Sequence, residues 1–342
     1  MYQTKFKPTK AGLLESRTAD IFAEHFTCHS DKEFFGKPFI LEDWQYKNMW
    51  TPVFGSINAK GERKLKRFLF GLPRDHGKSE FGCRAMTTHA NLYPSFNAEY
   101  GIFASSKGQA AIIYKKISVM IRQSPQLSAT WEVLKKEIVN KETGARIRVF
   151  PCNDTEAQGI HFAMAIIDEL HVIKSAGMYE SITSGMAHVK NSVLICITTA
   201  GPKRDGYLYN ELIPQFKKDK NAYIYWVGAD ENDKPEDRSC WKKAQIASWI
   251  DYDVLEDAFN STSKSSFMRY YLNQFPADDD SQEYVFNEEE LSKVIKARKE
   301  WDWSGRIVLG IDGAQNGDNF ALAYCRRDDD GKLGVFPIIF DK

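Results

Sequence analysis

The chain has 342 residues, of which 43% are hydrophobic and 27% are charged, and its formal net charge is zero. This length and composition predict a globular protein with a sizeable core and either two domains or one domain and part of another. A net charge of zero excludes a protein that attracts polyanions through its overall charge, so any polyanion site must be a local patch.

The cysteines and the N-terminus indicate the compartment. Six cysteines are spread along the sequence without a C-x-x-C pair, so neither a zinc site nor a disulfide framework is expected. The first residues, MYQTKFKPTK, lack the apolar core of a signal peptide, and no stretch approaches the ~20 apolar residues of a membrane span. We therefore expect a reduced, cytoplasmic protein without a membrane partner.

The first segment with recognisable chemistry contains Trp44 and Gln45. A glutamine amide can both donate to and accept from a purine edge while an aromatic ring packs nearby, so Gln45 is a candidate for binding adenine. The alternative is a helix start that Glu42 and Asp43 cap, with Trp44 in the core.

The stretch from Phe68 to Glu80, FLFGLPRDHGKSE, predicts a strand, a tight turn and a helix. Gly77 would let the backbone approach nucleotide phosphates, Lys78 would contact the β- and γ-phosphates, and the Ser79 hydroxyl would bind Mg²⁺. Leu72 replaces the first glycine of the usual G-x-x-x-x-G-K-[ST] pattern, so the loop alone is equally compatible with an ordinary helix start.

Basic residues occur on both sides of this loop. The run KGERKLKRF, residues 60–68, is interpreted as the solvated beginning of a strand. A helix is expected over 81–92, a second strand over 99–106, and a helix from Lys107 whose basic residues either meet a DNA backbone or form a solvated face.

A second chemical signal is the apolar run of residues 161–167, which ends in Asp168 and Glu169. Buried parallel strands are continuously apolar, and ligands of open α/β sheets bind at the carboxyl ends of the strands. We expect Asp168 to hold Mg²⁺ and Glu169 to polarise the attacking water. The alternative is an acid pair that merely caps the next helix.

A third apolar run, residues 192–201, ends in Thr198 and Thr199, whose hydroxyls could report whether a γ-phosphate is present. The alternative is a buried strand that ends in a simple turn. Residues 221–227 predict one more strand, and residues 239–275 are rich in helix formers and in aromatics that we expect to be core.

After a Pro- and Asp-rich linker at 276–281, the sequence predicts a helix over 288–298 and three strands over 306–314, 317–323 and 333–340. Asp312 follows the first strand, and Asp318 lies in the loop behind it. This order is typical of the opening of an RNase-H-like nuclease, where both carboxylates would bind catalytic Mg²⁺ or Mn²⁺. The alternative for Asp312 is an exposed residue of a β-turn.

Taken together, the order Trp44-Gln45, PRDHGKS, IIDELH, ITTAG, LNQF, linker and GIDGA resembles the large terminase subunit of tailed bacteriophages. In that family the phosphate loop often lacks the first glycine and carries a basic residue before Gly-Lys-Ser, as Arg74 does here. The resemblance implies an α/β fold: a P-loop NTPase of the ASCE type with a mostly parallel sheet and flanking helices, followed by a partial RNase-H-like domain. The residues that carry over are Gln45, Lys78 and Ser79 for the nucleotide, Asp168 for the metal, Glu169 for water activation, Thr198 and Thr199 for coupling, and Asp312 as the first nuclease carboxylate. Gly77 in the loop, Arg74 as a candidate charge stabiliser and Asp318 near Asp312 complete the set that we expect from the residues themselves.

The resemblance also implies a function and its partners. It implies an ATP-driven motor that moves double-stranded DNA into a procapsid in the host cytoplasm, as a homo-oligomeric ring with a small terminase subunit and a portal. The expected parts are an N-terminal segment 1–36, an ATPase domain 37–275 with a helical subdomain 230–275, a linker and helix 276–304, and a nuclease start 305–342. The chain ends at Lys342, soon after the third of the last strands, so we expect the nuclease to be incomplete and not to cleave DNA.

Two further hypotheses stay open. One is another DNA-dependent ATPase, such as a helicase-like remodeller, which would need a second motor domain. The other is a non-catalytic nucleotide-binding scaffold that carries Gly-Lys-Ser without turnover.

Overall fold

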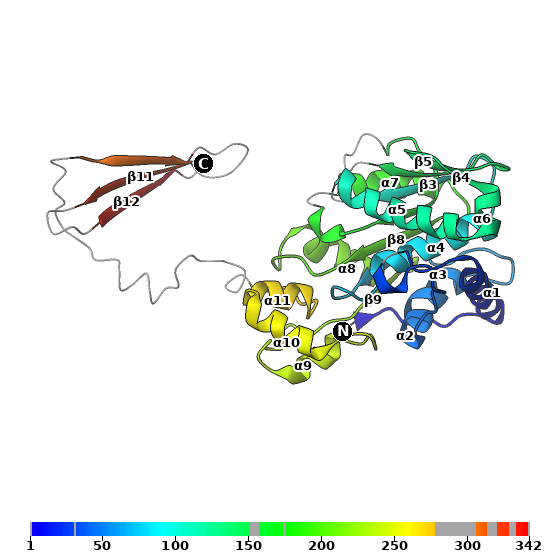
Figure 1. Ribbon diagram of the computed structural model, residues 1–342, viewed down its shortest axis with the longest axis horizontal. Helices are drawn as coiled ribbons and strands as arrows, with labels where there is room; N and C mark the ends of the chain where they lie inside the picture. Colours follow the sequence, from blue (N-terminus) through cyan, green and yellow to red (C-terminus); the bar gives the residue numbers. More distant parts are fainter. Residues whose placement is uncertain are drawn as a thin grey trace. The chain divides into compact units, whose positions relative to one another are not determined.

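The structure is a computed structural model that describes residues 2–30, 32–104, 106–150, 157–173, 176–277, 306–312, 320–327 and 333–340. The chain divides into two compact units, residues 1–282 and residues 283–342. Figure 1 colours both units along the sequence.

The first unit is built on a nine-stranded sheet with the strand order β1-β9-β2-β8-β7-β3-β6-β5-β4. The six strands from β9 to β6 are parallel, and antiparallel strands extend the sheet at both edges. The strands are β1 (Tyr2–Gln3), β2 (Arg67–Gly71), β3 (Glu99–Phe103), β4 (Trp131–Val133), β5 (Glu137–Asn140), β6 (Arg146–Phe150), β7 (Phe162–Ile167), β8 (Val193–Thr198) and β9 (Ala222–Trp226).

This arrangement confirms the expected α/β fold with a mostly parallel sheet. Strand β8 lies between the phosphate-loop strand β2 and the acid-pair strand β7, which is the strand order of the ASCE type. Five of the six parallel strands, β2, β3, β7, β8 and β9, lie where the sequence analysis expects strands, and the alternating pattern of residues 144–150 indicates the sixth, β6. Strand β1 and the β4–β5 hairpin were not expected from the sequence.

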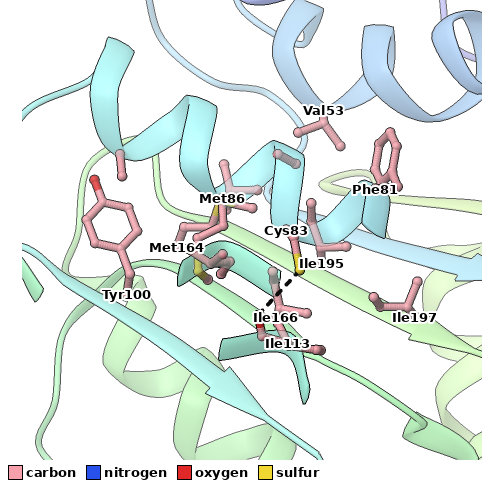
Figure 2. Packing of buried hydrophobic residues seen from close by; sticks show 14 of the residues in the cluster. Val53, Phe81, Cys83, Met86, Tyr100, Ile113, Met164, Ile166, Ile195 and Ile197 are labelled. Atoms are coloured by element: carbon pink, nitrogen blue, oxygen red, sulfur yellow. Dashed lines mark hydrogen bonds between the residues drawn. The ribbon is translucent and has the colours of Figure 1, made fainter. Parts of the chain in front are cut away.

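Helices cover both faces of the sheet because successive strand residues point to opposite sides. Phe68 and Phe70 pack into one core with α1, α3, α4 and α5, whereas Leu69 packs into a second core with α7 and α8. Figure 2 shows the first core, where Cys83 of α4 lies among isoleucines of β7 and β8. The helices are α1 (Lys10–Phe26), α2 (Asp43–Gln45), α3 (Thr51–Gly55), α4 (Lys78–Leu92), α5 (Lys107–Gln123), α6 (Pro125–Thr130), α7 (Gly177–Ala187) and α8 (Ile213–Lys218).

Short helical turns and three small helices complete the first unit. The turns are 3₁₀ at Lys32–Phe34 and Leu170–Val172 and π-helical at Tyr46–Trp50 and Leu208–Leu212. The small helices are α9 (Arg238–Ala244), α10 (Tyr252–Ser261) and α11 (Lys264–Tyr270). They enclose a separate small core in which Trp241, Phe259 and Phe267 pack together.

The second unit is an antiparallel sheet in the order β10-β11-β12. Its strands are β10 (Val308–Asp312), β11 (Phe320–Arg327) and β12 (Leu333–Phe340). Asp312 is the last residue of β10 and pairs in register with Ala321. Asp318 and the helix expected over 288–298 lie outside the described residues. In the part of the chain that the structure describes, no helix is both long enough and apolar enough to cross a membrane.

The packing at the end of β2 yields a test of the fold. A Cβ atom on Gly71 would lie 2.1 Å from Cε3 of Trp226, and that indole is stacked between Tyr2 and Phe275 with ring centroids 5.6 and 5.3 Å away. We expect Gly71→Ala to lower the free energy of unfolding by about 1–3 kcal/mol, because overpacking forces buried groups apart. Urea unfolding monitored by circular dichroism measures the change.

The matched control is Gly108→Ala in the first turn of α5, where the nearest atom to a new Cβ is Ser106 Oγ at 3.7 Å. This change should leave the free energy of unfolding within about 1 kcal/mol of the wild type. Equal midpoints for both variants would contradict the packing described at Gly71.

Candidate nucleotide-binding and catalytic site

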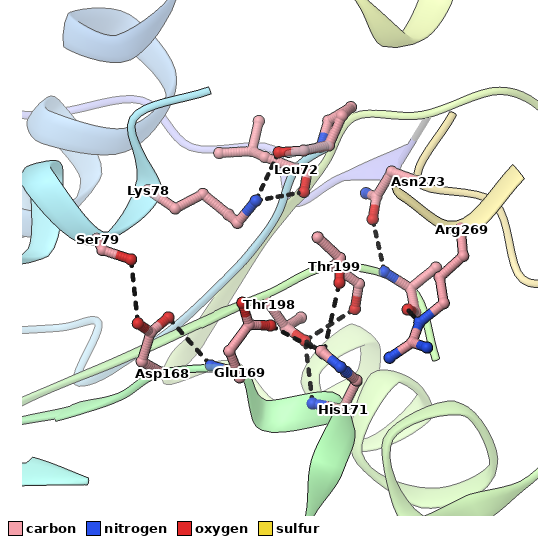
Figure 3. A network of polar contacts seen from close by, with 12 residues as sticks. Leu72, Lys78, Ser79, Asp168, Glu169, His171, Thr198, Thr199, Arg269 and Asn273 are labelled. Atoms are coloured by element: carbon pink, nitrogen blue, oxygen red, sulfur yellow. Dashed lines mark hydrogen bonds and ion pairs between the residues drawn. The ribbon is translucent and has the colours of Figure 1, made fainter. Parts of the chain in front are cut away.

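The phosphate loop connects β2 to α4 at the carboxyl edge of the sheet. Gly77 has φ 69°, a left-handed conformation that glycine adopts without steric cost, and it precedes the first residue of α4. Lys78 is buried, and its Nζ donates to the carbonyl oxygens of Leu72 at 2.9 Å and Pro73 at 2.5 Å (Figure 3). The ammonium group is thus held over the loop by two neutral acceptors that a phosphate oxygen can replace.

Ser79 and Asp168 meet although their strands are not neighbours. The Ser79 hydroxyl donates to Asp168 Oδ2 at 3.0 Å, and the Asp168 backbone N–H donates to the Phe103 carbonyl at 2.8 Å. Mg²⁺ prefers oxygen ligands and takes only one or two of them from protein when phosphates and water supply the rest. A hydroxyl and a carboxylate at this distance fit that ion.

Glu169 has an unusual backbone. Its φ is 52°, in the left-handed region that non-glycine residues rarely adopt, and its N–H donates to Asp168 Oδ1 at 3.0 Å. Such a conformation costs about 1–3 kcal/mol and is concentrated at functional sites. The Glu169 side chain is 37% exposed. It can therefore reach a water molecule.

Three buried or half-buried charges meet here. Burial lowers the pKa of Lys78 to about 8, against the opposing attraction of Glu169 and Asp168. Burial, together with the charge of Glu169, raises the pKa of Asp168 to about 6. For Glu169, burial acts to raise the pKa, but the contact with His171 and the charges of Lys78 and Arg74 outweigh it, so the pKa lies below its ordinary value. Glu169 is therefore ionised and able to accept a proton near neutral pH.

His171 connects the acid pair to the threonines, a role for which the sequence offered only its position two residues after Glu169. Its Nδ1 lies 3.1 Å from Glu169 Oε2, 3.2 Å from Thr198 Oγ1 and 3.4 Å from Thr199 Oγ1. Its backbone N–H donates to Thr198 Oγ1 at 3.0 Å, and that hydroxyl donates to the Thr199 carbonyl. Both threonines are buried, and the imidazole connects them to the Glu169 carboxylate.

Ala200, the residue after the two threonines, is hydrogen-bonded to two side chains in and just after α11. The backbone N–H of Ala200 donates to Asn273 Oδ1 at 2.7 Å, and its carbonyl accepts from Arg269 Nε at 3.0 Å. Arg74 of the phosphate loop lies against the same helix, with its guanidinium carbon 3.3 Å from the centre of the Tyr270 ring. The small helices therefore contact both the phosphate loop and the threonine loop.

Aromatic side chains also lie beside the phosphate loop. Gln45 is buried, and its Oε1 accepts from the Glu42 backbone N–H at 3.0 Å, so the helix cap expected as the alternative is present. Its Nε2 would still lie 3.5 Å from a Cβ at Gly77. Trp249 was expected in the core, but it is 44% exposed and its indole N–H donates to the Asp75 carbonyl of the loop at 2.8 Å. The ring centroids of Trp44 and Trp249 are 6.4 Å apart.

The structure thus brings together the predicted site residues of the first unit. A phosphate loop after β2, an acid pair after β7 and a threonine loop after the intervening β8 define a P-loop NTPase fold of the ASCE type. The first-unit residues that gather at this edge are Gln45, Arg74, Gly77, Lys78, Ser79, Asp168, Glu169, Thr198 and Thr199. Asp312 is described only as the end of β10 in the second unit.

Comparison with known proteins identifies the family. Residues 43–217 match the family model of the terminase large subunit ATPase domain. This match covers just over half of the chain, and the chain belongs to that family. No curated protein matches the sequence.

Solved structures share the fold. The large terminase of bacteriophage HK97 superposes with a TM-score of 0.65 and 18% identity, over 95% of this chain and 67% of that one. The large terminase ATPase domain of Thermus phage P74-26 superposes with a TM-score of 0.50 and 15% identity, over 72% of this chain and 99% of that one. The chain therefore spans about two thirds of the length of the HK97 protein.

The pKa of Asp168 predicts a pH dependence of stability. Because the pKa is higher in the folded protein than the ordinary value of 3.8, the folded state binds more protons between pH 4 and about 6. The associated stability is complete below pH 3.8 and is lost as the pH rises through about 6. The whole difference amounts to about 3 kcal/mol.

We therefore expect Asp168→Asn to be more stable than the wild type at pH 7.5 in EDTA, by up to about 3 kcal/mol, with the advantage shrinking as the pH falls toward 4. Urea unfolding from pH 4 to 8 measures it. Asp257→Asn on the exposed face of α10 serves as the control and should run parallel to the wild type. A constant difference between Asp168→Asn and the wild type across this range would rule out the environment described for Asp168.

Proposed function

We propose that this chain hydrolyses ATP and uses the energy to move double-stranded DNA into a procapsid. The observation that carries the proposal is the meeting of Lys78, Ser79, Asp168 and Glu169 at one sheet edge in a chain of this family. Lys78 binds the β- and γ-phosphates, and Ser79 and Asp168 would hold Mg²⁺, which neutralises phosphate charge. Glu169 accepts a proton from the attacking water and orients it toward the γ-phosphate.

Other residues prepare and transmit this step. Gln45, with Trp44 and Trp249 beside the loop, binds the adenine. Arg74 supplies positive charge to the transition state once it leaves the ring of Tyr270, and a neighbouring subunit of a homo-oligomeric ring supplies a further arginine. Thr198 and Thr199 respond to the γ-phosphate through His171.

The remaining parts of the proposal concern partners. Contacts to DNA are made to phosphates and are independent of sequence, and a small terminase subunit and a portal present the DNA and the procapsid. The host cytoplasm is the place of action. Asp312 and Asp318 belong to a nuclease site that takes Mg²⁺ or Mn²⁺.

One structural observation favours the motor over a helicase-like remodeller. A remodeller needs a second motor domain, and the described residues between 205 and 277 contain one strand and short helices instead. A non-catalytic scaffold differs from both in having no turnover.

The central test is Glu169→Gln, which keeps the shape of the side chain but removes the base. We expect its rate of ATP hydrolysis, with DNA and procapsid present, to fall about 10²–10⁴-fold while ATP binding is retained. Phosphate release and protection of DNA from nuclease are the measurements. Glu180→Gln on the exposed face of α7 is the matched control and should keep wild-type turnover. Equal rates of ATP hydrolysis in the wild type and Glu169→Gln would contradict the role of Glu169 as the general base.

His171 is a positioning residue, because it contacts Glu169 and the threonines rather than the reacting atoms. We expect His171→Ala to lower kcat about 10–100-fold, the usual cost of removing a group that orients a catalytic side chain, with little change in KM for ATP. His171→Asn keeps a donor near the Nδ1 position and should recover part of the rate. A purely structural role would instead leave both variants with the same activity per folded molecule.

A further inference from the structure

A cavity of about 570 Å³ lies at the amino-terminal edge of the nine-stranded sheet. It opens between Arg67 at the start of β2, Leu194 near the start of β8, and Ala187 at the end of α7. The strands are parallel, so this edge is opposite the phosphate loop, and five residues of β2 at about 3.3 Å each separate the two. The volume falls within the range of about 300–1,000 Å³ that is typical of ligand sites.

The wall of this cavity is strongly basic. Five basic residues and one acidic residue, Glu62, line it. Two of the basic side chains already have partners: Arg67 Nε donates to Asp219 Oδ2 at 3.1 Å, and buried Arg63 donates to Ser56 Oγ at 3.1 Å. The other three are Lys64, Lys66 and Lys220, none of which has an ion pair within the described residues.

The loop that carries Lys64 and Lys66 is held in place. Asn191 Oδ1 accepts from the Arg63 backbone N–H, and its Nδ2 donates to the Gly61 carbonyl, both at 2.9 Å. Asn58 Nδ2 binds Glu62 Oε2 at 2.9 Å, which directs the one acidic side chain toward the loop itself. The backbone that leads into Lys64 and Lys66 is therefore ordered before any ligand arrives, which lowers the entropic cost of binding.

We propose that this cavity binds phosphate groups of the duplex DNA backbone. Three ammonium groups without carboxylate partners around one concavity attract a polyanion, and a lysine binds phosphate as a compact point charge. Because the net charge of the chain is zero, such attraction depends on a local patch of this kind. None of the described residues lining the cavity is aromatic, so the stacking that holds unpaired bases at single-strand sites is missing. The identity of the ligand as DNA rests on the proposed motor function.

The test neutralises the three lysines together in the full chain, as Lys64→Gln, Lys66→Gln and Lys220→Gln. We expect the affinity for a labelled blunt-ended duplex, measured by fluorescence anisotropy at 100 mM KCl, to fall tenfold or more. The slope of log affinity against log salt should become shallower by about 0.9 for each lost phosphate contact. ATP hydrolysis without DNA should remain at the wild-type rate, because the site lies at the other edge of the sheet.

The control removes three lysines from the β4–β5 hairpin region, as Lys135→Gln, Lys136→Gln and Lys141→Gln, and should keep the wild-type affinity and slope. Equal losses in the two triple variants, or an unchanged slope in the cavity variant, would overturn the proposal. So would loss of binding to a polyglutamate peptide with unchanged DNA binding, which would assign the cavity to an acidic protein segment. Absence of ATP turnover in the wild type, with the slope effect present, would instead defeat the proposed motor and leave the phosphate site standing.

Discussion

The candidate site depends on one geometric constraint, the insertion of β8 between β2 and β7. Neighbouring strands lie about 4.8 Å apart, so the phosphate loop and the acid pair leave the sheet about 10 Å from each other. Helix α4 closes this gap because it crosses the sheet on the face formed by β7 and β8. Its first turn brings the Ser79 hydroxyl to 3.0 Å from Asp168 Oδ2.

The same edge of the sheet buries two ionisable groups, Lys78 and Asp168, whose charged forms are disfavoured there, and nucleotide binding can stabilise these charges. Lys78 donates to two backbone carbonyls, and burial raises the pKa of Asp168 so that it holds its proton more tightly than an exposed aspartate does. Both groups are buried at a cost that an anion and a divalent cation would offset together. Binding of the two is therefore expected to be cooperative, since each ion improves the environment of the other.

Much of this fold could be predicted because its signals are local. The run from Phe68 to Phe70 and the run before Asp168 are continuously apolar, and polar residues follow both at the point where parallel strands end. Sheet topology then requires Ser79 and Asp168 to share one edge. Hairpin β4–β5 was missed because its strands have only three and four residues, too few to show a clear alternation.

The contacts of the site were harder to predict because they join distant parts of the chain. His171 could be placed near Glu169 from the sequence, but its contact with Thr198 depends on the left-handed turn at Glu169. The exposure of Trp249 and its bond to Asp75 depend on how three short helices pack, which no periodic pattern encodes. The basic run at 60–68 could not be recognised as part of a cavity from the sequence, because Lys220, which lines the same cavity, is distant in the chain.

The two hydrogen bonds that hold the backbone of Ala200 have a mechanical consequence. Ala200 is held through its N–H by Asn273 and through its carbonyl by Arg269, so the two hydrogen bonds restrain the threonine loop against α11 and the residues that follow it. A small displacement of the threonine loop that leaves both hydrogen bonds intact therefore also moves the small helices. In the proposed motor, these two hydrogen bonds would pass movement of the threonine loop to the small helices up to the displacement at which the bonds break.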